Sequence, residues 1–158
     1  MSTRLNIAER PGCLRTLASI FAHSGDSPLW IVGFSVVWWL GNEFWKREAL
    51  AALIGIFVTA AATFALKYLI RRQRPEGEWG AIYRRFDAHS FPSGHSVRMA
   101  MLATVAALLG PPPLATALVV LAALVMLARV AMGVHYLLDV AGGAVVGVII
   151  GAGIVIML

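Results

Sequence analysis

Five stretches of the chain are almost continuously apolar, and polar or turn-forming segments separate them. Each stretch is close to the length that an α-helix needs to cross about 30 Å of hydrocarbon. The pattern predicts an all-α fold, a polytopic membrane helical bundle of about five transmembrane helices, at 28–44, 49–70, 93–109, 114–132 and 136–158. A short polar hairpin over 42–48 and the rigid run 110–113 are expected to join consecutive helices.

The N-terminal segment has a shorter apolar patch, at 14–22, which is too short to span a bilayer. Arginines flank this patch, so we expect an amphipathic helix that lies on the membrane surface. The chain is then a single membrane-embedded domain, with 1–27 as an interfacial segment and 28–158 as the transmembrane core. His23 and Asp26, in the turn before the first span, are interpreted as turn and capping residues.

Composition agrees with a membrane protein, because 59% of the residues are hydrophobic and only 13% are charged. The net charge of +5 comes mainly from loops between apolar stretches, where it would meet lipid headgroups and anionic substrates rather than nucleic acid. Cys13 is the only cysteine, which excludes an intrachain disulfide and a cysteine-based metal cluster. In the last stretch Gly143, Gly147 and Gly151 recur every four residues, a spacing that indicates close helix packing within one bundle.

Ionisable residues gather at one level of the predicted bundle. If the last four spans cross the membrane in alternation, one face receives Lys67, Arg74, the helix start at Ser93, Arg129, His135 and Asp139. Ionisable groups in or near membrane spans are costly, so their convergence from several helices predicts a functional site.

Spacing along the helices refines this picture. His135 and Asp139 are four residues apart, so the carboxylate can accept a hydrogen bond from the imidazole. Lys67 and Arg74 are seven residues apart and would share a helix face if that helix continued to Pro75. Gly133 offers the bend that would bring Arg129 toward His135.

The segment 91–96, Phe-Pro-Ser-Gly-His-Ser, marks the start of a helix. Backbone N–H groups of Ser93 and Gly94 at the positive end of the helix dipole are expected to form a site for a phosphate. His95 follows directly. A capped helix start with an incidental histidine is the plain alternative.

Other residues also have plain alternatives. Lys67 can extend to the lipid headgroups, and Arg71 and Arg72 are expected to do so. Arg129 can be a helix-end anchor, and Asp139 can be a partner of the helix dipole. Two histidines, one carboxylate and three cations around one helix N-terminus have no evident packing purpose, so we favour the functional interpretation.

Phosphoryl transfer is the chemistry that fits this set. Lys67, Arg74 and Arg129 can stabilise charge on phosphate oxygens, and arginine binds phosphate through two hydrogen bonds. A histidine held by a carboxylate can attack phosphorus, while a second histidine protonates the leaving oxygen. No cofactor and no metal ion are expected, because the carboxylates lack a ligand spacing and the cations would repel a metal.

Three motifs resemble those of one family. Lys67 to Pro75 fits K-x6-RP, Pro92 to His95 fits PSGH, and Arg129 to Asp139 fits R-x5-H-x3-D. In this order and spacing they resemble the signature motifs of the type 2 phosphatidic acid phosphatase superfamily, in its membrane lipid phosphate phosphatase branch. The chain departs from the common pattern at Ala128, where the family usually has serine.

The resemblance implies roles for the matched residues. His135 would be the nucleophile that forms a phosphohistidine, Asp139 its orienting group, and His95 the acid for the leaving group and then the base for water. The phosphate-binding residues would be Lys67, Arg74, Ser93, Gly94 and Arg129.

It also implies a function and a location. The chain would remove phosphate from a membrane lipid such as a polyprenyl diphosphate, phosphatidate, phosphatidylglycerophosphate or lipid A, in a bacterial-type inner membrane. Transfer of the phosphate to another acceptor, or a non-enzymatic binding role, remain alternatives. The surplus of Lys and Arg favours a cytoplasmic site, whereas many bacterial relatives act at the periplasmic face, so the side and the oligomeric state stay open.

Overall fold

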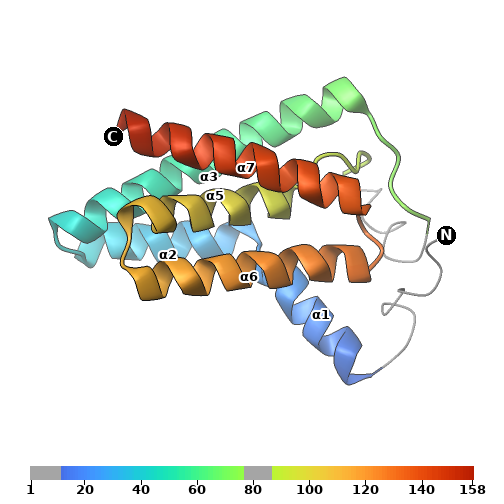
Figure 1. Cartoon of the computed structure of the whole chain (residues 1–158), viewed down its shortest axis with the longest axis horizontal. Helices are drawn as coiled ribbons and strands as arrows, with labels where there is room; N and C mark the ends of the chain where they lie inside the picture. The colour runs from blue at the N-terminus through green and yellow to red at the C-terminus, as the bar shows by residue number, and fades with distance from the viewer. Residues whose placement is uncertain (1–11, 77–86) are drawn as a thin grey trace.

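The computed structural model of the 158-residue chain describes residues 12–76 and 87–158. This part of the chain contains six helices: α1 (Cys13–Ser24), α2 (Ser27–Leu40), α3 (Glu43–Ile70), α5 (Gly94–Leu109), α6 (Pro112–Ala131) and α7 (Leu137–Met157). Five of them run lengthwise in one bundle, and α1 leaves the bundle obliquely (Figure 1). The predicted all-α membrane bundle is confirmed. Arg4, Arg10, Arg84 and Arg85, among the basic loop residues of the sequence, lie outside the described residues.

The predicted spans differ in length. Helices α3, α6 and α7 are long and apolar enough to cross a membrane, whereas α2 and α5 are shorter apolar helices of 14 and 16 residues. The first span was predicted to reach Phe44, but α2 ends at Leu40. Its cap, Gly41, closes the helix by donating its N–H to the Val37 carbonyl at 2.8 Å.

The polar hairpin predicted over 42–48 is wrong, because α3 already begins at Glu43. Asn42 caps this helix by accepting a hydrogen bond from the Trp45 N–H at 3.1 Å, and Glu43 pairs with Lys46 at 3.0 Å one turn on. The turn predicted over 110–113 is also too long, because α6 already begins at Pro112. Proline suits the first turn of a helix, where its missing N–H has no intrahelical partner.

Helix α5 packs against α3, α6 and α7. Its side chains Val97, Met99 and Met101 are fully buried. The glycine stripe of α7 packs closely within the bundle, as predicted, and its partner is α5: a Cβ at Gly143 would lie 2.9 Å from the Ser93 carbonyl, and one at Gly151 would lie 2.8 Å from Thr104 Cβ. The bare glycine backbone therefore allows α5 and α7 to approach closely.

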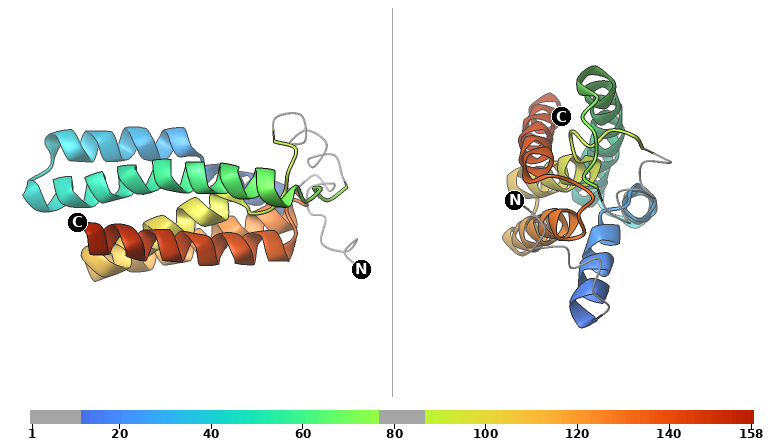
Figure 2. Two further views of the ribbon diagram at one scale, coloured as in Figure 1. Left: turned by 90° about the horizontal axis from the view of Figure 1, so that it is seen from above. Right: turned by 90° about the vertical axis from the view of Figure 1, so that its right-hand side faces the viewer.

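Helix α1 is amphipathic, as the N-terminal apolar patch predicted. Leu14, Leu17 and Ile20 are exposed on it, while Ala22 is buried against α6 and the turn that follows α6. The end-on view shows α1 projecting from the side of the bundle (Figure 2). Such a helix fits a position in the membrane interface.

One end of the bundle brings together the C-terminal ends of α3 and α6 and the N-terminal ends of α2, α5 and α7 (Figure 1). The helix ends that carry the candidate residues thus meet at this end.

Candidate active site

A cavity of about 480 Å³ opens at this end. Six of the eight candidate residues line it, namely Lys67, Arg74, Gly94, His95, Arg129 and His135. The other two, Ser93 and Asp139, are completely buried. Histidines and cations that lie far apart in the sequence therefore surround one hollow, the arrangement that the alternating spans predict.

Lys67 and Arg74 reach the cavity by different routes, so the expected shared helix face is wrong. Helix α3 ends at Ile70, and Arg71 caps it in the left-handed conformation, with φ 49°. The chain then doubles back, and Ser90 donates its N–H to the Arg72 carbonyl at 2.8 Å. This pairing brings Arg74 from the connecting segment to the same cavity as Lys67 of α3.

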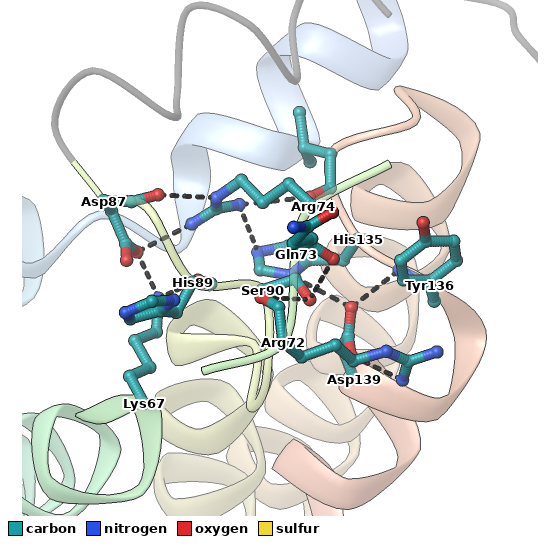
Figure 3. Close-up of polar contacts among 11 residues, drawn as sticks. Lys67, Arg72, Gln73, Arg74, Asp87, His89, Ser90, His135, Tyr136 and Asp139 are labelled. Atoms are coloured by element: carbon teal, nitrogen blue, oxygen red, sulfur yellow. Dashed lines mark hydrogen bonds and ion pairs between the residues drawn. The ribbon is translucent and has the colours of Figure 1, made fainter. Parts of the chain in front are cut away.

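One carboxylate joins these two cations. Both Lys67 Nζ and Arg74 Nη2 bind Oδ2 of Asp87, the latter at 2.7 Å (Figure 3). Burial alone would raise the pKa of Asp87, but the bonds from Lys67 and Arg74 outweigh it and hold the pKa below its usual value. The sequence marked Asp87 only as a carboxylate without metal-ligand spacing. In the structure, the Asp87 carboxylate shows that Lys67 and Arg74 can bind one anion together.

His135 is held next to this ion pair. Its Nε2 lies 3.3 Å from Arg74 Nη1, and the guanidinium also donates to the Val134 carbonyl at 3.0 Å. Arginine can only donate, so this contact requires a lone pair on Nε2 and places the proton of the neutral ring on Nδ1. Burial, together with Arg129, Arg74 and Lys67, lowers the pKa of His135 from 6.5 to about 3 despite the Asp139 carboxylate. Its ring is therefore neutral, with Nε2 available as a nucleophile.

Asp139 lies on the other side of this imidazole. Its Oδ2 accepts a hydrogen bond from the Tyr136 N–H at 2.8 Å and lies 3.7 Å from His135 Nδ1, beyond hydrogen-bond length. Its Oδ1 accepts from Arg72 Nη1 at 2.9 Å (Figure 3). The expectation that Arg72 extends to the headgroups is wrong, because its guanidinium fixes Asp139 and lies 4.5 Å from the centre of the Tyr136 ring.

The start of α5 differs from the expected phosphate site in one respect. The Ser93 N–H donates to the Asp139 carbonyl at 3.0 Å, so it is already engaged and fastens α5 to α7. The prediction that this N–H faces a phosphate is therefore wrong. Gly94 does line the cavity, and the buried Ser93 hydroxyl has no hydrogen-bond partner within residues 12–76 and 87–158.

Arg129 comes from the last turn of α6 and is buried at the cavity wall. The chain turns sharply after α6 at Gly133, whose φ of 64° suits glycine. Val134 then donates its N–H back to the Arg129 carbonyl at 3.3 Å. This is the bend that the sequence predicted, and it places His135 and Arg129 at the same hollow.

His95 has a partner that the sequence did not reveal. Its Nε2 lies 2.8 Å from Oδ1 of Asp26, in the turn between α1 and α2. Asp26 is the N-cap residue of α2, as predicted, but its side chain makes no capping hydrogen bond and binds His95 and His23 instead. The hydrogen bond with His95 lowers the pKa of Asp26 from 3.8 to about 2, so the carboxylate is ionised at neutral pH.

The described residues contain no group of three His, Cys, Asp or Glu side chains that could hold a metal ion. Four cations line the cavity, namely Lys67, Arg74, Arg98 and Arg129, against the one carboxylate of Asp87 among the described lining residues. An anion is the ligand that such a wall favours.

Comparison with known proteins identifies relatives of this chain. The chain is 36% identical to decaprenylphosphoryl-5-phosphoribose phosphatase of Mycobacterium tuberculosis over 150 residues, which cover 92% of this chain and 81% of that protein. It is 32% identical to the enzyme of the same name from Mycolicibacterium smegmatis over 138 residues, 87% of this chain and 74% of that protein. Named phosphatases are therefore among its relatives.

Two solved structures share the fold. The PAP2-type phosphatidylglycerolphosphate phosphatase of Bacillus subtilis is 26% identical, with a TM-score of 0.77 over 99% of this chain and 81% of that one. Aquifex aeolicus LpxE is 24% identical, also with a TM-score of 0.77, over 96% of this chain and 90% of that one.

The model of the PAP2 superfamily matches residues 48–158, which include every candidate site residue. Together with the phosphatase relatives, this match assigns the chain to the enzymes, as a metal-independent phosphatase of phosphoric esters. Family membership thus accounts for the three motifs, the helical bundle and the anion-binding cavity at its end. The chain belongs to the PAP2 superfamily.

Proposed function

We propose that this membrane phosphatase hydrolyses the terminal phosphate of a polyprenyl-linked phosphosugar, of the decaprenylphosphoryl-5-phosphoribose type, through a phosphohistidine on His135. The observation that carries the chemistry is the position of Arg74. Its guanidinium binds the Asp87 carboxylate on one side and lies 3.3 Å from His135 Nε2 on the other. The same guanidinium therefore contacts both the bound anion and the nitrogen that would attack it.

In the proposed reaction the substrate phosphate replaces the Asp87 carboxylate on Lys67 and Arg74. Arg129 and the N–H of Gly94 add further donors at the cavity wall. His135 Nε2 attacks phosphorus, the bond from phosphorus to the alcohol oxygen breaks, and His95 gives that oxygen a proton. His95 then takes a proton from water as the water oxygen attacks phosphorus, and the phosphorus–nitrogen bond breaks to release phosphate.

Asp139 would support this reaction from the Nδ1 side of the His135 ring, opposite the attacking nitrogen. The attack makes the His135 ring positively charged, and the ionised carboxylate 3.7 Å from Nδ1 stabilises that charge. The bonds from Arg72 and the Tyr136 N–H fix both carboxylate oxygens, so Asp139 cannot turn away. The same carboxylate favours the Nδ1-protonated ring that leaves Nε2 free to attack.

The lipid tail would enter from the side of α3. Ala60, Thr63 and Phe64 line the cavity together with the charged residues, and Phe64 is exposed on the outer surface of the bundle. A tail can thus remain among apolar side chains while its phosphate meets Lys67 at the end of the same helix. The mycobacterial relatives favour a polyprenyl substrate and a bacterial plasma membrane.

The test is phosphate release by the purified full chain in detergent from decaprenylphosphoryl-5-phosphoribose, phosphatidylglycerophosphate, phosphatidate and undecaprenyl diphosphate. We expect the first to give the highest kcat/KM, activity that survives excess EDTA, and inhibition by vanadate, which imitates pentacoordinate phosphorus. Preference for another lipid would overturn the substrate assignment. Phosphate that appears on an added alcohol in place of water would identify a phosphotransferase, and no turnover of any lipid would contradict the proposed function.

A further inference from the structure

We infer that Asp26 is a positioning residue for proton transfer: it holds His95 in the ring orientation and protonation state from which this histidine serves the leaving group. The inference rests on the proposed function, because it concerns the proton that the departing alcohol needs. It adds to that reaction a carboxylate from the turn between α1 and α2, outside the three motifs.

The contact itself has the geometry of a strong hydrogen bond, with 2.8 Å between His95 Nε2 and Asp26 Oδ1. An ionised carboxylate can only accept, so the proton of this bond belongs to Nε2. Nδ1 is then the nitrogen of His95 that remains for exchange with the substrate, since no hydrogen bond engages it within the described part of the chain. Asp26 thus selects which ring nitrogen works at the cavity.

The turn that carries Asp26 is built against His95. A Cβ placed on Gly25 would lie 2.9 Å from His95 Cδ2 and 3.2 Å from Val125 Cγ1, so only a glycine backbone comes this close without displacing them. Arg98, one turn after His95 on α5, donates to the Gly25 carbonyl. Trp30 Nε1 donates to the Ser24 carbonyl at 2.8 Å. The backbone directly before Asp26 is therefore held by side chains of α5 and α2.

The charges around His95 indicate that its contact with Asp26 does more than anchor the turn. Arg98 and Arg129 line the same cavity as His95, and Asp26 is the carboxylate that contacts this ring. A histidine surrounded only by cations would hold a proton poorly and could not deliver it to an alkoxide. His23 Nδ1, 3.2 Å from Asp26 Oδ2, keeps the second oxygen in place.

Two substrates with the same alkyl tail but different leaving groups distinguish a defect in proton delivery from a defect in folding. A folding defect slows both substrates, whereas loss of proton delivery slows only the one whose leaving group needs a proton. Decyl phosphate releases an alkoxide that needs a proton, whereas 4-decylphenyl phosphate releases a stable phenolate that does not. The value of kcat/KM covers only the steps up to loss of the leaving group, so it reports this proton. We expect Asp26→Asn to lower kcat/KM about 10²-fold for decyl phosphate and by less than about threefold for the phenyl ester.

Trp30→Phe is the matched control, because it removes an anchor of the same turn without touching His95. It is expected to lower the thermal midpoint but to leave the ratio of the two kcat/KM values at the wild-type level. Asp26→Ser, which keeps a turn-forming side chain, replaces Asp26→Asn if that variant does not fold. Asp26→Glu, which keeps the charge, should recover part of the lost activity toward decyl phosphate.

The inference is overturned if Asp26→Asn leaves decyl phosphate turnover unchanged, or if it slows both substrates equally. His95→Gln distinguishes this from failure of the proposed function. If wild-type protein cleaves neither ester, or if His95→Gln cleaves decyl phosphate as fast as wild type, the proposed reaction fails. If His95→Gln loses decyl phosphate selectively and Asp26→Asn does not, only the role of Asp26 fails.

Discussion

The two histidines of the cavity each have a carboxylate, but the two pairs are built in different ways. His135 and Asp139 lie four residues apart, and 3.7 Å separates His135 Nδ1 from Asp139 Oδ2. His95 and Asp26 lie 69 residues apart and touch at 2.8 Å. The local pair is visible in the sequence as a spacing of four, whereas the distant pair exists only because the α1–α2 turn packs against α5.

The difference also separates two chemical tasks. His135 is buried beside Arg74, which requires a lone pair on Nε2, and its own carboxylate is engaged by Arg72 and Tyr136. That ring is prepared to attack. His95 instead donates Nε2–H directly to a half-exposed carboxylate, and that ring is prepared to exchange a proton. In the proposed reaction, similar components thus serve as a nucleophile in one pair and as an acid–base group in the other.

Phosphoenzyme labelling gives the largest expected contrast between the pairs. His135→Gln should lose turnover by on the order of 10⁵-fold and acquire no label from ³²P-labelled 4-decylphenyl phosphate, because no nucleophile remains. His95→Gln should still become labelled with this ester, since the phenolate leaves unaided, and should keep the label for longer because water is no longer activated. The label that stays on the protein after an alkaline quench, which preserves the acid-labile phosphorus–nitrogen bond, is measured against time and checks both.

Wild-type protein treated with vanadate provides the background for this measurement, and intact folding is checked by thermal unfolding. Label on His135→Gln equal to that on wild type would remove His135 as the nucleophile. Rapid loss of label from His95→Gln would remove His95 as the base. Either result would end the division of tasks between the two pairs.

Asp139→Asn should have the next largest effect. An amide keeps the shape but neither balances the ring charge nor favours the Nδ1-protonated ring, so we expect kcat to fall about 10³-fold with little change in KM. Arg72→Gln, which releases only one oxygen of Asp139, should lower kcat about tenfold. Steady-state kinetics on the same lipid checks both, and a rise in KM without loss of kcat would assign Asp139 to structure or to binding.

The sequence could predict whatever depends on spacing or on periodic pattern. The apolar stretches predicted the bundle, the glycines of α7 predicted close helix packing within it, and Gly133 predicted the bend before His135. The first helix boundary failed because Glu43 and Lys46 are polar residues inside a helix turn rather than in a loop. Hydropathy cannot separate these two cases when the polar turn lies at the end of a membrane helix.

Long-range contacts between polar side chains were beyond prediction. Arg72 resembled any arginine at a helix end, and Asp26 resembled any turn residue, until the fold placed them against Asp139 and His95. The N–H of Ser93 was predicted to be open because local helix geometry leaves it so, yet α7 supplies the Asp139 carbonyl. Each of these contacts joins segments whose separation in sequence carries no pattern.

Asp87 sharpens the comparison because it is a carboxylate that binds neither histidine. It occupies Lys67 and Arg74, so a phosphate must displace it, and Asp87→Asn should lower KM about tenfold with kcat nearly unchanged. The same variant leaves two buried cations without their anion, so its thermal midpoint should fall and inorganic phosphate should restore it. Glu76→Gln, which removes an exposed charge from the same connection, is the control and should change neither value. A higher KM for Asp87→Asn would mean that Asp87 organises the cations for substrate instead of competing with it.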